Sequence, residues 1–278
     1  MTQAAKGGVF ITGAATGIGA ATTRRLAEAG YRVFAGVHRE AGSLGIPGVQ
    51  PVAIDVTDPS GVENAAKVVA EAAGEGGLRA VINNAGVMVQ GPLELVPAGE
   101  LRRQFEVNTL GPAHVIQAFL PLLRTGKGRI INISAPTARV PVPFMAPLGG
   151  SKAALASFSD SLRLELGAWG IPVTVIEPGG TDTAIFQKAE TAARATLGAA
   201  DPAKVALYSD QLAAVAKAAA RQRLGPTEAV AKTILAAVEA RKPKRRYAAG
   251  SGTAVFGVLA HAPVSLREQL IKTVFGLG

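Results

Sequence analysis

Short apolar segments alternate along this chain with longer segments in which apolar residues recur every three or four positions. The apolar segments have the length of strands and lie at 8–12, 32–37, 51–55, 79–83, 128–134 and 172–177. The longer segments predict helices over 17–29, 58–73, 100–123, 148–168 and 226–240. Strands that are apolar throughout and separated by helices indicate an α/β fold, a Rossmann-like doubly wound parallel sheet with helices on both faces.

The alternation continues to Glu177 without a linker, so we expect residues 1–278 to form a single domain. Residues 184–225 are rich in alanine, have a helical pattern and contain no strand segment. A helical segment in that position is expected to form a substrate lid over the carboxyl edge of the sheet. Residues 241–278 predict a C-terminal extension made of one strand, "RRYAAG", and a terminal helix.

The composition excludes several classes of protein. The chain has 278 residues and no cysteine, which rules out disulfides and thiolate chemistry and agrees with the reducing cytoplasm, where we expect it to reside. No apolar run approaches the roughly 18 residues of a spanning helix, so no membrane span is expected. No metal site is predicted.

The formal net charge of +9 raises the question of a nucleic-acid partner, and much of it gathers in "RKPKRR", residues 241–246. This run lies between a predicted helix and a predicted strand, where a solvated linker is the simpler interpretation. No aromatic interleaving or nucleic-acid motif accompanies it. We therefore expect no nucleic-acid partner, and a binding site for a polyanion stays as the alternative.

A glycine-rich turn follows the first strand segment in "TGAATGIG", residues 12–19. Such a strand-to-helix turn lets the backbone approach a pyrophosphate, and the amino end of the helix offers unpaired N–H groups and a positive dipole. The spacing Gly13-x-x-x-Gly17-x-Gly19 differs from the common dinucleotide fingerprint. By itself the turn is equally compatible with close packing of helix on strand.

Other polar motifs also follow strand segments. "DVTD" (55–58) ends the third, "NNAG" (83–86) the fourth, and "PGGTDT" (178–183) the sixth, while Asn108 lies in a helix beyond the fourth. The carboxyl ends of the strands are where doubly wound sheets bind ligands, so these motifs are expected to meet at one edge.

This order of motifs resembles the short-chain dehydrogenase/reductase family over nearly the whole chain. The resemblance implies a seven-stranded nucleotide-binding sheet, a nicotinamide cofactor and hydride transfer to or from a carbonyl or alcohol. It places the pyrophosphate at Gly13, Thr16, Gly17, Ile18 and Gly19, and adenine and its ribose at Asp55, Val56, Asn84, Ala85 and Gly86. Lys152 would hold the nicotinamide ribose, and Pro178, Gly179 and Thr183 would lie at the carboxamide. Asn108 and Lys152 are the catalytic residues that it retains.

The end of the second strand segment bears on the choice of dinucleotide. Where an acidic residue would accept a hydrogen bond from the 2′-hydroxyl of NAD, the chain has Val37, followed by His38 and Arg39. A cationic pair suits a 2′-phosphate, so NADP(H) is favoured over NAD(H), although Glu40 and the alternative of an exposed basic turn leave this open.

The family's tyrosine and serine are missing. Family members carry a Tyr four residues before the Lys and a Ser thirteen before that Tyr, and these positions hold Leu148 and Ala135 here. Ser134 belongs to the other face of the strand end. Tyr208 in the expected lid is the first candidate for a substitute donor. Tyr31, Tyr247 and the histidines His38, His114 and His261 are weaker candidates. A relay of the proton from Lys152 through water is a further alternative.

Two functions follow from this degenerate site. The first is an atypical reductase for a small lipophilic carbonyl, enone, imine or alcohol, since an iminium or activated enone accepts hydride without an acid. The second is an NADP-binding pseudoenzyme or sensor without ordinary turnover. The tail, with Arg246 and Tyr247, looks most like relatives that act on steroids or retinoids. The helices at 100–123 and 148–168 resemble the family's dimer-forming faces, so a homodimer or homotetramer is expected.

Overall fold

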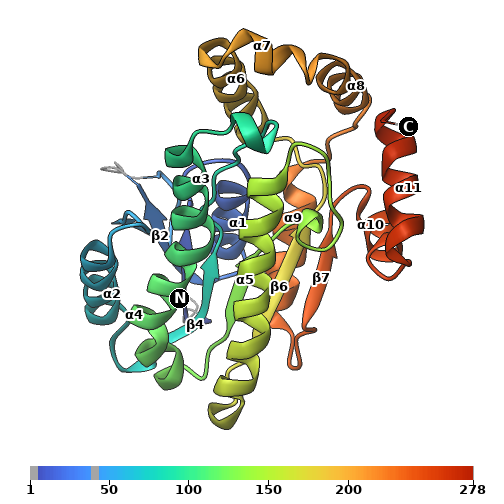
Figure 1. The fold of residues 1–278 in the computed structure, drawn as a ribbon. Coiled ribbons are helices and arrows are strands. Elements are labelled where there is room, and N and C mark those ends of the chain that lie inside the picture. The colour runs from blue at the N-terminus through green and yellow to red at the C-terminus, as the bar shows by residue number, and fades with distance from the viewer. Residues whose placement is uncertain (1–5, 39–43, 278) are drawn as a thin grey trace.

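In the computed structural model, which describes residues 6–38 and 44–277, seven strands form one parallel sheet in the order β3-β2-β1-β4-β5-β6-β7 (Figure 1). The strands are β1 Gly8–Thr12, β2 Arg32–Val37, β3 Val49–Ala53, β4 Leu78–Asn83, β5 Ile130–Ile133, β6 Val173–Pro178 and β7 Arg246–Ala249. Because β1 pairs with both β2 and β4, the chain reverses its direction of travel across the sheet there. The carboxyl ends of β1 and β4 therefore flank the crevice in which doubly wound sheets bind ligands.

The helices cover both faces of this sheet and extend beyond it. They are α1 Gly17–Glu28, α2 Pro59–Ala73, α3 Ala98–Phe105, α4 Gly111–Thr125, α5 Ala146–Glu165, α6 Ala184–Ala199, α7 Pro202–Ala206, α8 Ser209–Ala220, α9 Thr227–Glu239, α10 Thr253–Leu259 and α11 Val264–Phe275. Helices α6 to α8 lie above the carboxyl edge, and α10 and α11 lie beside β7 (Figure 1). Shorter helical turns are η1 Gly74–Gly76, η2 Leu93–Leu95, η3 Glu106–Leu110, η4 Pro136–Ala138 and η5 Leu166–Trp169.

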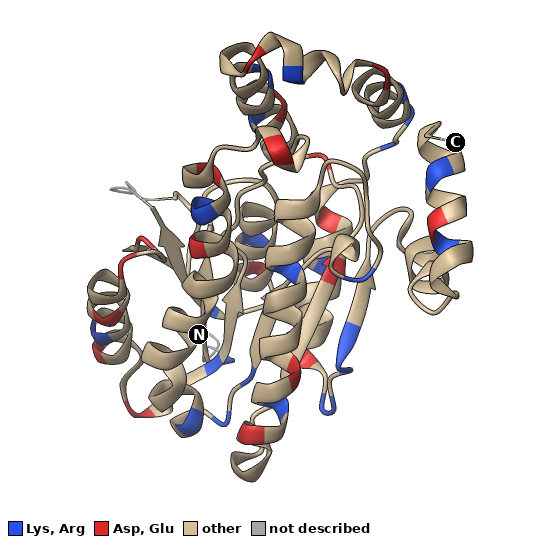
Figure 2. Cartoon of the chain, in the orientation of Figure 1, with Lys and Arg blue, Asp and Glu red and all other residues tan. Residues whose placement is uncertain are grey.

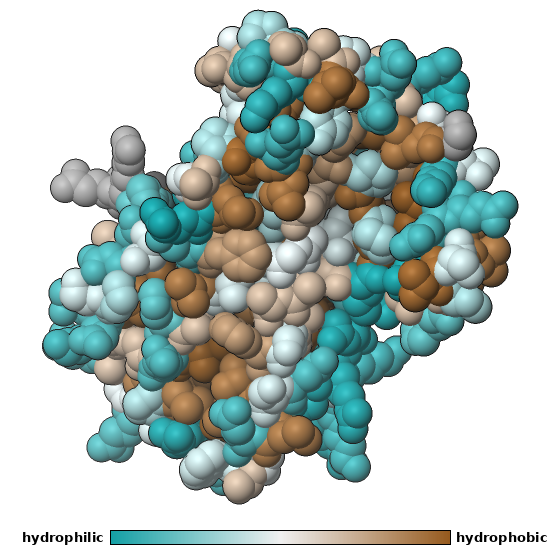
Figure 3. Space-filling view, viewed as in Figure 1, coloured by the Kyte–Doolittle hydropathy of each residue, from teal (hydrophilic) through white to brown (hydrophobic). Residues whose placement is uncertain are grey.

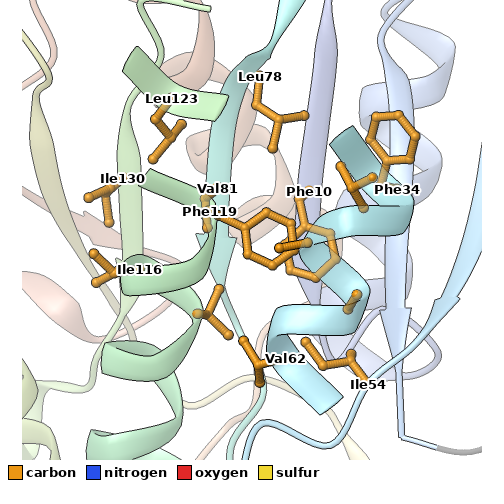
Figure 4. Packing of buried hydrophobic residues seen from close by; sticks show 14 of the residues in the cluster. Phe10, Phe34, Ile54, Val62, Leu78, Val81, Ile116, Phe119, Leu123 and Ile130 are labelled. Carbon is orange, nitrogen blue, oxygen red and sulfur yellow. The ribbon is translucent and has the colours of Figure 1, made fainter. Parts of the chain in front are cut away.

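Alternate residues of the strands supply two separate cores. Phe10 packs on the α2 and α4 side, where it joins Phe34, Val81 and Ile130 (Figure 4). Val9 and Ile11 point to the opposite face and pack with residues of α1 and α9. The sheet is thus buried on both faces, which explains why its strands are apolar at every position rather than at alternate ones.

The predicted seven-stranded fold is confirmed, and several boundaries were wrong. Residues 128–134 contain a strand of four residues, because the Gly128 N–H donates to the Leu123 carbonyl and closes α4 instead. The helix expected over 100–123 is two α-helices joined by the π-helical turn η3. The third strand ends at Ala53, so Asp55 lies in the loop beyond it.

The C-terminal extension also differs from the prediction. It holds two helices where one was expected, because α10 ends at Leu259 and α11 starts only after Pro263, which caps it and cannot lie in a helix interior. Residues 241–245 of the basic run connect α9 to β7, as predicted, whereas Arg246 is the first residue of β7. In the view of Figure 2, Lys and Arg are scattered among Asp and Glu and form no continuous stripe. Among the described residues, no helix is both long and apolar enough to cross a membrane.

We predict that Phe119→Ala lowers the free energy of unfolding by about 3–5 kcal/mol. The Phe119 ring stacks on that of Phe10, with the ring centroids 4.1 Å apart, and both side chains are fully buried. The truncation would leave a cavity between α4 and the sheet. Urea unfolding measures the effect, with the more exposed Phe158→Ala as the matched control. Equal losses for the two variants would contradict this account of the core.

Candidate functional site

The glycine-rich turn joins β1 to α1 at the crevice. Gly13 and Gly17 have φ angles of 65° and 53°, which glycine adopts without strain. A side chain on Gly19 would collide with the Gly13 carbonyl oxygen, so this glycine permits the close approach of helix to turn. Thr16 precedes α1 in an extended conformation without a side-chain cap, and the first turn holds no acid. The amino end of α1 is therefore suited to an anion.

The side chain of Asn84 fastens this turn to the end of β4. Its Nδ2 donates to the Thr12 and Gly13 carbonyl oxygens at 2.9 and 3.1 Å. The Thr12 Oγ1 accepts from the N–H groups of Asn84 and Ala85, both at 3.0 Å. Because the Asn84 amide is used inside the protein, the backbone around Ala85 and Gly86 is what this segment offers to a ligand.

Lys152, Asn108 and Gly86 meet at the bottom of the crevice. The Asn108 side chain donates to the Val87 carbonyl and accepts from the Val87 N–H, both at 2.9 Å, which orients the amide. A Cβ on Gly86 would lie 3.3 Å from the Asn108 Oδ1 and 3.7 Å from the Lys152 Nζ. A side chain at this position would press on the Asn108 amide and meet the Lys152 ammonium at ordinary contact distance, so glycine leaves both polar groups room.

Lys152 is buried although it lies at the edge of the sheet. Its Nζ donates to the Ile133 carbonyl at 2.7 Å. Burial lowers the pKa of this ammonium from 10.5 to about 8, because the charged form is poorly solvated. An ammonium carries three donors, so a ligand with hydroxyl groups would satisfy those that the Ile133 carbonyl does not.

Sequence reasoning missed Gln104 and Ser151, two fully buried residues behind Asn108. The Gln104 side chain donates to the Val87 carbonyl and accepts from the Val89 N–H, at 2.9 and 2.6 Å. The Ser151 Oγ lies 3.2 Å from the Gln104 Nε2 and 3.4 Å from the Asn108 Nδ2. A signal was available in the sequence, since Gln104 lies four residues before Asn108 on one helical segment.

The two replaced positions lie beside Lys152 in the fold. Leu148 is in the first turn of α5, one helical turn before Lys152, and is half-buried. Ala135 follows β5 and is also half-buried. Ser134 points the other way, as predicted, because its buried Oγ donates to the Lys152 carbonyl at 3.2 Å. Neither side chain, at the positions where the resemblance predicts an acid and a hydroxyl, has a proton to donate.

Tyr208 is engaged elsewhere. Its phenol donates to the Glu94 carboxylate at 2.9 Å, and its ring meets that of Phe144 edge-on with centroids 6.3 Å apart. The hydrogen bond to Glu94 raises the pKa of this phenol, with burial and the charge of Glu94 acting in the same direction. In this conformation the phenol is a weaker acid than an ordinary tyrosine.

The remaining tyrosines and two histidines have structural partners. Tyr31 is buried in the core, and the Tyr247 Oη accepts from the Lys244 N–H at 3.0 Å. One ring nitrogen of His114 lies 3.2 Å from the Val56 carbonyl, and one of His261 lies 2.9 Å from the Gly257 carbonyl. These contacts place the side chains in packing and capping roles.

At the far end of the crevice His38 pairs with Asp55. The His38 Nε2 lies 3.1 Å from the Asp55 Oδ2, and the Asp55 Oδ1 accepts from the Thr57 N–H and hydroxyl at 2.9 and 2.7 Å. Burial alone would raise the pKa of Asp55, but the Thr57 hydrogen bonds and His38 outweigh it and lower the pKa. Arg39 lies outside the described residues.

The loop after β6 closes the crevice from the side of α6. A Cβ on Gly17 would lie 3.0 Å from the Thr183 methyl group, so this loop touches the glycine-rich turn. The Gly179 N–H donates to the Ala249 carbonyl at 2.8 Å, and Thr181 bridges to Gly225. Thr183 therefore lies beside Gly17 of the predicted pyrophosphate residues, while Gly179 is held by the end of β7.

Comparison with known proteins agrees with this arrangement. The short chain dehydrogenase family model matches residues 8–194. Rat (Rattus norvegicus) estradiol 17-beta-dehydrogenase 2 is 32% identical over 96% of this chain and 74% of its own length. Human (Homo sapiens) retinol dehydrogenase 5 is 32% identical over 96% of this chain and 88% of its own length. The NADPH-dependent 3-dehydrocapnine reductase of Ornithobacterium rhinotracheale is 33% identical over 85% of this chain and 86% of its own length.

Solved structures give the same result. A short chain dehydrogenase from Burkholderia cenocepacia in complex with NADP is 28% identical and superposes with a TM-score of 0.75, covering 96% of this chain and 98% of the other. One from Streptomyces avermitilis is 25% identical, with a TM-score of 0.76 and 96% of each chain covered. The chain belongs to the short-chain dehydrogenase/reductase family of oxidoreductases.

Proposed function

We propose that this chain is an atypical NADP(H)-dependent short-chain oxidoreductase that acts on a small lipophilic substrate. The observation that carries the proposal is a retained cofactor-binding constellation, Lys152 with Asn108 and Gly86, beside Leu148 and Ala135 in place of the family's proton donor and hydroxyl. The substrate class that fits best is an iminium or an activated enone, because its carbon accepts hydride without an acid from the protein. Ordinary carbonyls and alcohols would be poor substrates.

The residues present fit a nicotinamide dinucleotide. The amino end of α1 has no side-chain cap, and the glycine-rich turn brings the backbone close to it. The buried Lys152 ammonium has donors that a ribose would satisfy. Gly13, Thr16, Gly17, Ile18 and Gly19 would hold the pyrophosphate, and Pro178, Gly179 and Thr183 would border the carboxamide.

A bound nicotinamide would supply or accept the hydride. Lys152 would hold the ribose through its Nζ, which is fixed by the Ile133 carbonyl. Asn108 would keep the backbone at Val87 in place, supported by Gln104 and Ser151. General acid catalysis is typically worth about 10² to 10⁴ in rate and one oxyanion donor about 10² to 10³, so losing both would strongly favour activated substrates.

A pseudoenzyme or sensor is the second candidate. It rests on the same Leu148 and Ala135, since a protein that only binds NADP(H) needs Lys152 for the ribose but no proton donor. The lid and the relatives favour the first candidate. Retinol and estradiol dehydrogenases are among the similar proteins, which agrees with a lipophilic substrate.

Helices α6 to α8 are proposed as the substrate lid. Glu94 ties them to the loop after β4, because its carboxylate accepts from the Tyr208 phenol and lies 3.7 Å from the Lys204 Nζ. Breaking these contacts would let the lid open, and a phenol released from Glu94 is the substitute donor that we propose.

NADP(H) is preferred over NAD(H) in this proposal because β2 ends in Val37 and is followed by His38. His38 is exposed and pairs with Asp55, a residue that the family resemblance assigns to adenine. The similar reductase named as NADPH-dependent and the structure in complex with NADP agree with this preference.

A homodimer or homotetramer in the cytoplasm is also proposed. Its support is the exposed apolar side chains on and beside α4 and α5, among them Leu110, Phe158 and Leu164. Exposed apolar groups on two adjacent helices are typical of an interface between copies.

We predict that NADPH binds more tightly than NADH in calorimetric titrations. Replacing His38 by Ala should reduce the difference in affinity between NADPH and NADH, since a charge-assisted contact with the 2′-phosphate is worth about 1.5–3 kcal/mol. His261→Ala, which removes an exposed histidine of the C-terminal segment, is the matched control. Equal affinities for the two cofactors in the parent protein would show that the preference is wrong.

We predict that Leu148→Tyr combined with Ala135→Ser produces reduction of a lipophilic ketone by NADPH. The phenol would share a helix face with Lys152, whose charge favours the phenolate, and the hydroxyl would orient the carbonyl. The measurement is single-turnover NADPH oxidation in parent and variant over a panel of ketones, iminium ions and activated enones.

The matched control for this gain is Leu148→Phe with Ala135→Ser, which adds the ring without its hydroxyl. Overpacking of about 1–3 kcal/mol is expected in both, so their stabilities should be compared. A gain in ketone reduction that only the phenol variant shows supports the proposal that the parent lacks a proton donor at this position. Brisk turnover of ordinary ketones by the parent would overturn it, and cofactor binding with no turnover of any panel member would favour the sensor.

We predict that Lys152→Met raises the free energy of unfolding at neutral pH by about 2 kcal/mol while weakening NADPH binding. Moving the pKa from 10.5 to about 8 corresponds to about 3 kcal/mol, and the lost hydrogen bond offsets about 1. Between these two values the folded parent binds fewer protons than the unfolded chain, so its stability rises with pH there. The gain in the free energy of unfolding of Lys152→Met over the parent should therefore disappear by about pH 10.

Urea unfolding of parent and variant at neutral and alkaline pH measures this effect. Lys67→Met, at an exposed lysine of α2, is the control and should change stability little at either pH. A variant less stable than the parent at neutral pH would mean that Lys152 has charged partners in the protein.

A further inference from the structure

The C-terminal helices expose an unusual amount of apolar surface. Six valine and leucine side chains there are between 43% and 74% exposed: Val255 and Val258 on α10, and Val264, Leu266, Leu270 and Val274 on α11. We call these six residues the C-terminal apolar face. In Figure 3 apolar side chains reach the surface at the right margin, where Figure 1 places α10 and α11.

Helix α11, which carries four of these six residues, is held to the protein by its other side. Leu266, Leu270 and Val274 follow one another at intervals of four and form a stripe along α11. Ile271 is buried against the protein, and the Arg267 guanidinium donates to the Arg139 carbonyl at 3.3 Å. At the end of α11, a Cβ on Gly276 would be in ordinary contact with Ala214 of α8, 3.9 Å away. The stripe can therefore be covered without unfolding the helix.

We propose that the C-terminal apolar face docks on an anionic lipid surface. A helix with an apolar stripe, held parallel to a surface, inserts that stripe shallowly between lipid headgroups. The proposal does not depend on which reaction the crevice supports.

The area of the face favours a lipid surface over a second copy of the chain. Fully burying such a side chain is worth about 1.5–3 kcal/mol at about 25 cal/mol per Å², which corresponds to roughly 60–120 Å² each. Six side chains exposed by about half to three-quarters thus present on the order of 300–400 Å². A stable dimer buries about 800 Å² per partner. Roughly 60% of such an interface is apolar, or about 500 Å² per partner, which is more than this face presents. Shallow insertion between headgroups does not require an area of that size.

The charges around the face also fit an anionic surface. On α11 the Arg267 guanidinium donates to the Arg139 carbonyl on the anchored side, and Lys272 and Glu268 balance each other, 1 − 1 = 0. Residues 209–224 hold Lys217, Arg221 and Arg223 against Asp210, a balance of 3 − 1 = +2. Figure 2 shows blue segments at the end of α8 and on α11, which pack on each other. Cations near a membrane are attracted by anionic headgroups, within a distance of about 10 Å at ordinary salt.

Vesicle flotation of the full chain tests the proposal. The probes are phosphatidylcholine vesicles with and without about one third phosphatidylserine, at low and high salt. We expect binding to the anionic vesicles at least about fivefold tighter than to the neutral ones at low salt, and a smaller difference at high salt. Leu266→Ser with Val274→Ser should weaken binding at least about tenfold.

The matched control is Leu93→Ser with Val68→Ser, which removes one exposed leucine and one exposed valine elsewhere and should leave binding unchanged. If circular dichroism shows that the first variant is unfolded, Leu270→Glu decides, since it adds a charge that anionic lipid repels. Absence of vesicle binding by the parent overturns the proposal, as does binding retained by the stripe variants. A change of oligomeric mass without vesicle binding also overturns it and assigns the face to a second copy.

Discussion

The parallel sheet must be buried on both faces, and the rest of the structure depends on this constraint. Every strand of a βαβ series runs in the same direction, so all carboxyl ends meet at one edge and all helix connections lie on the faces. Phe10 packs against one helix layer while Val9 and Ile11 pack against the other. The glycine-rich turn follows the carboxyl end of β1, and η3 and α5 bring Asn108 and Lys152 to the same edge of the sheet.

Burial of a lysine at that edge is the chemical consequence. Lys152 lies on a helix packed against the sheet, and its ammonium reaches the Ile133 carbonyl at the end of β5. Burial disfavours its charge and lowers its pKa to about 8. A buried amine whose donors are not all paired destabilises the protein unless a ligand binds it, so Lys152 is a cost in stability to the free protein.

An ion-pair network ties the elements around this edge together. The buried Glu177 at the end of β6 accepts from Arg139, which follows η4, and from Arg246 of β7 at 2.7 and 3.1 Å. Arg246 also donates to Asp160 of α5 at 2.9 Å. Arg139 receives the Arg267 contact from α11, so the C-terminal extension is linked to the loop that begins at Ala135. A buried carboxylate is tolerated here because two guanidiniums surround it.

The sequence by itself determined the strand and helix alternation, the parallel sheet and the meeting of the motifs at one edge, since hydrophobic period and motif order are local properties. It also showed that Leu148 and Ala135 hold no acid, because that depends only on counting from Lys152. Tertiary structure decided what the side chains touch. The Asn84 side chain donates to the glycine-rich turn, and the Tyr208 phenol donates to Glu94. Ser151 lies within hydrogen-bonding distance of both Gln104 and Asn108. These partners come from elements far apart in the chain, and only packing brings them within hydrogen-bonding distance.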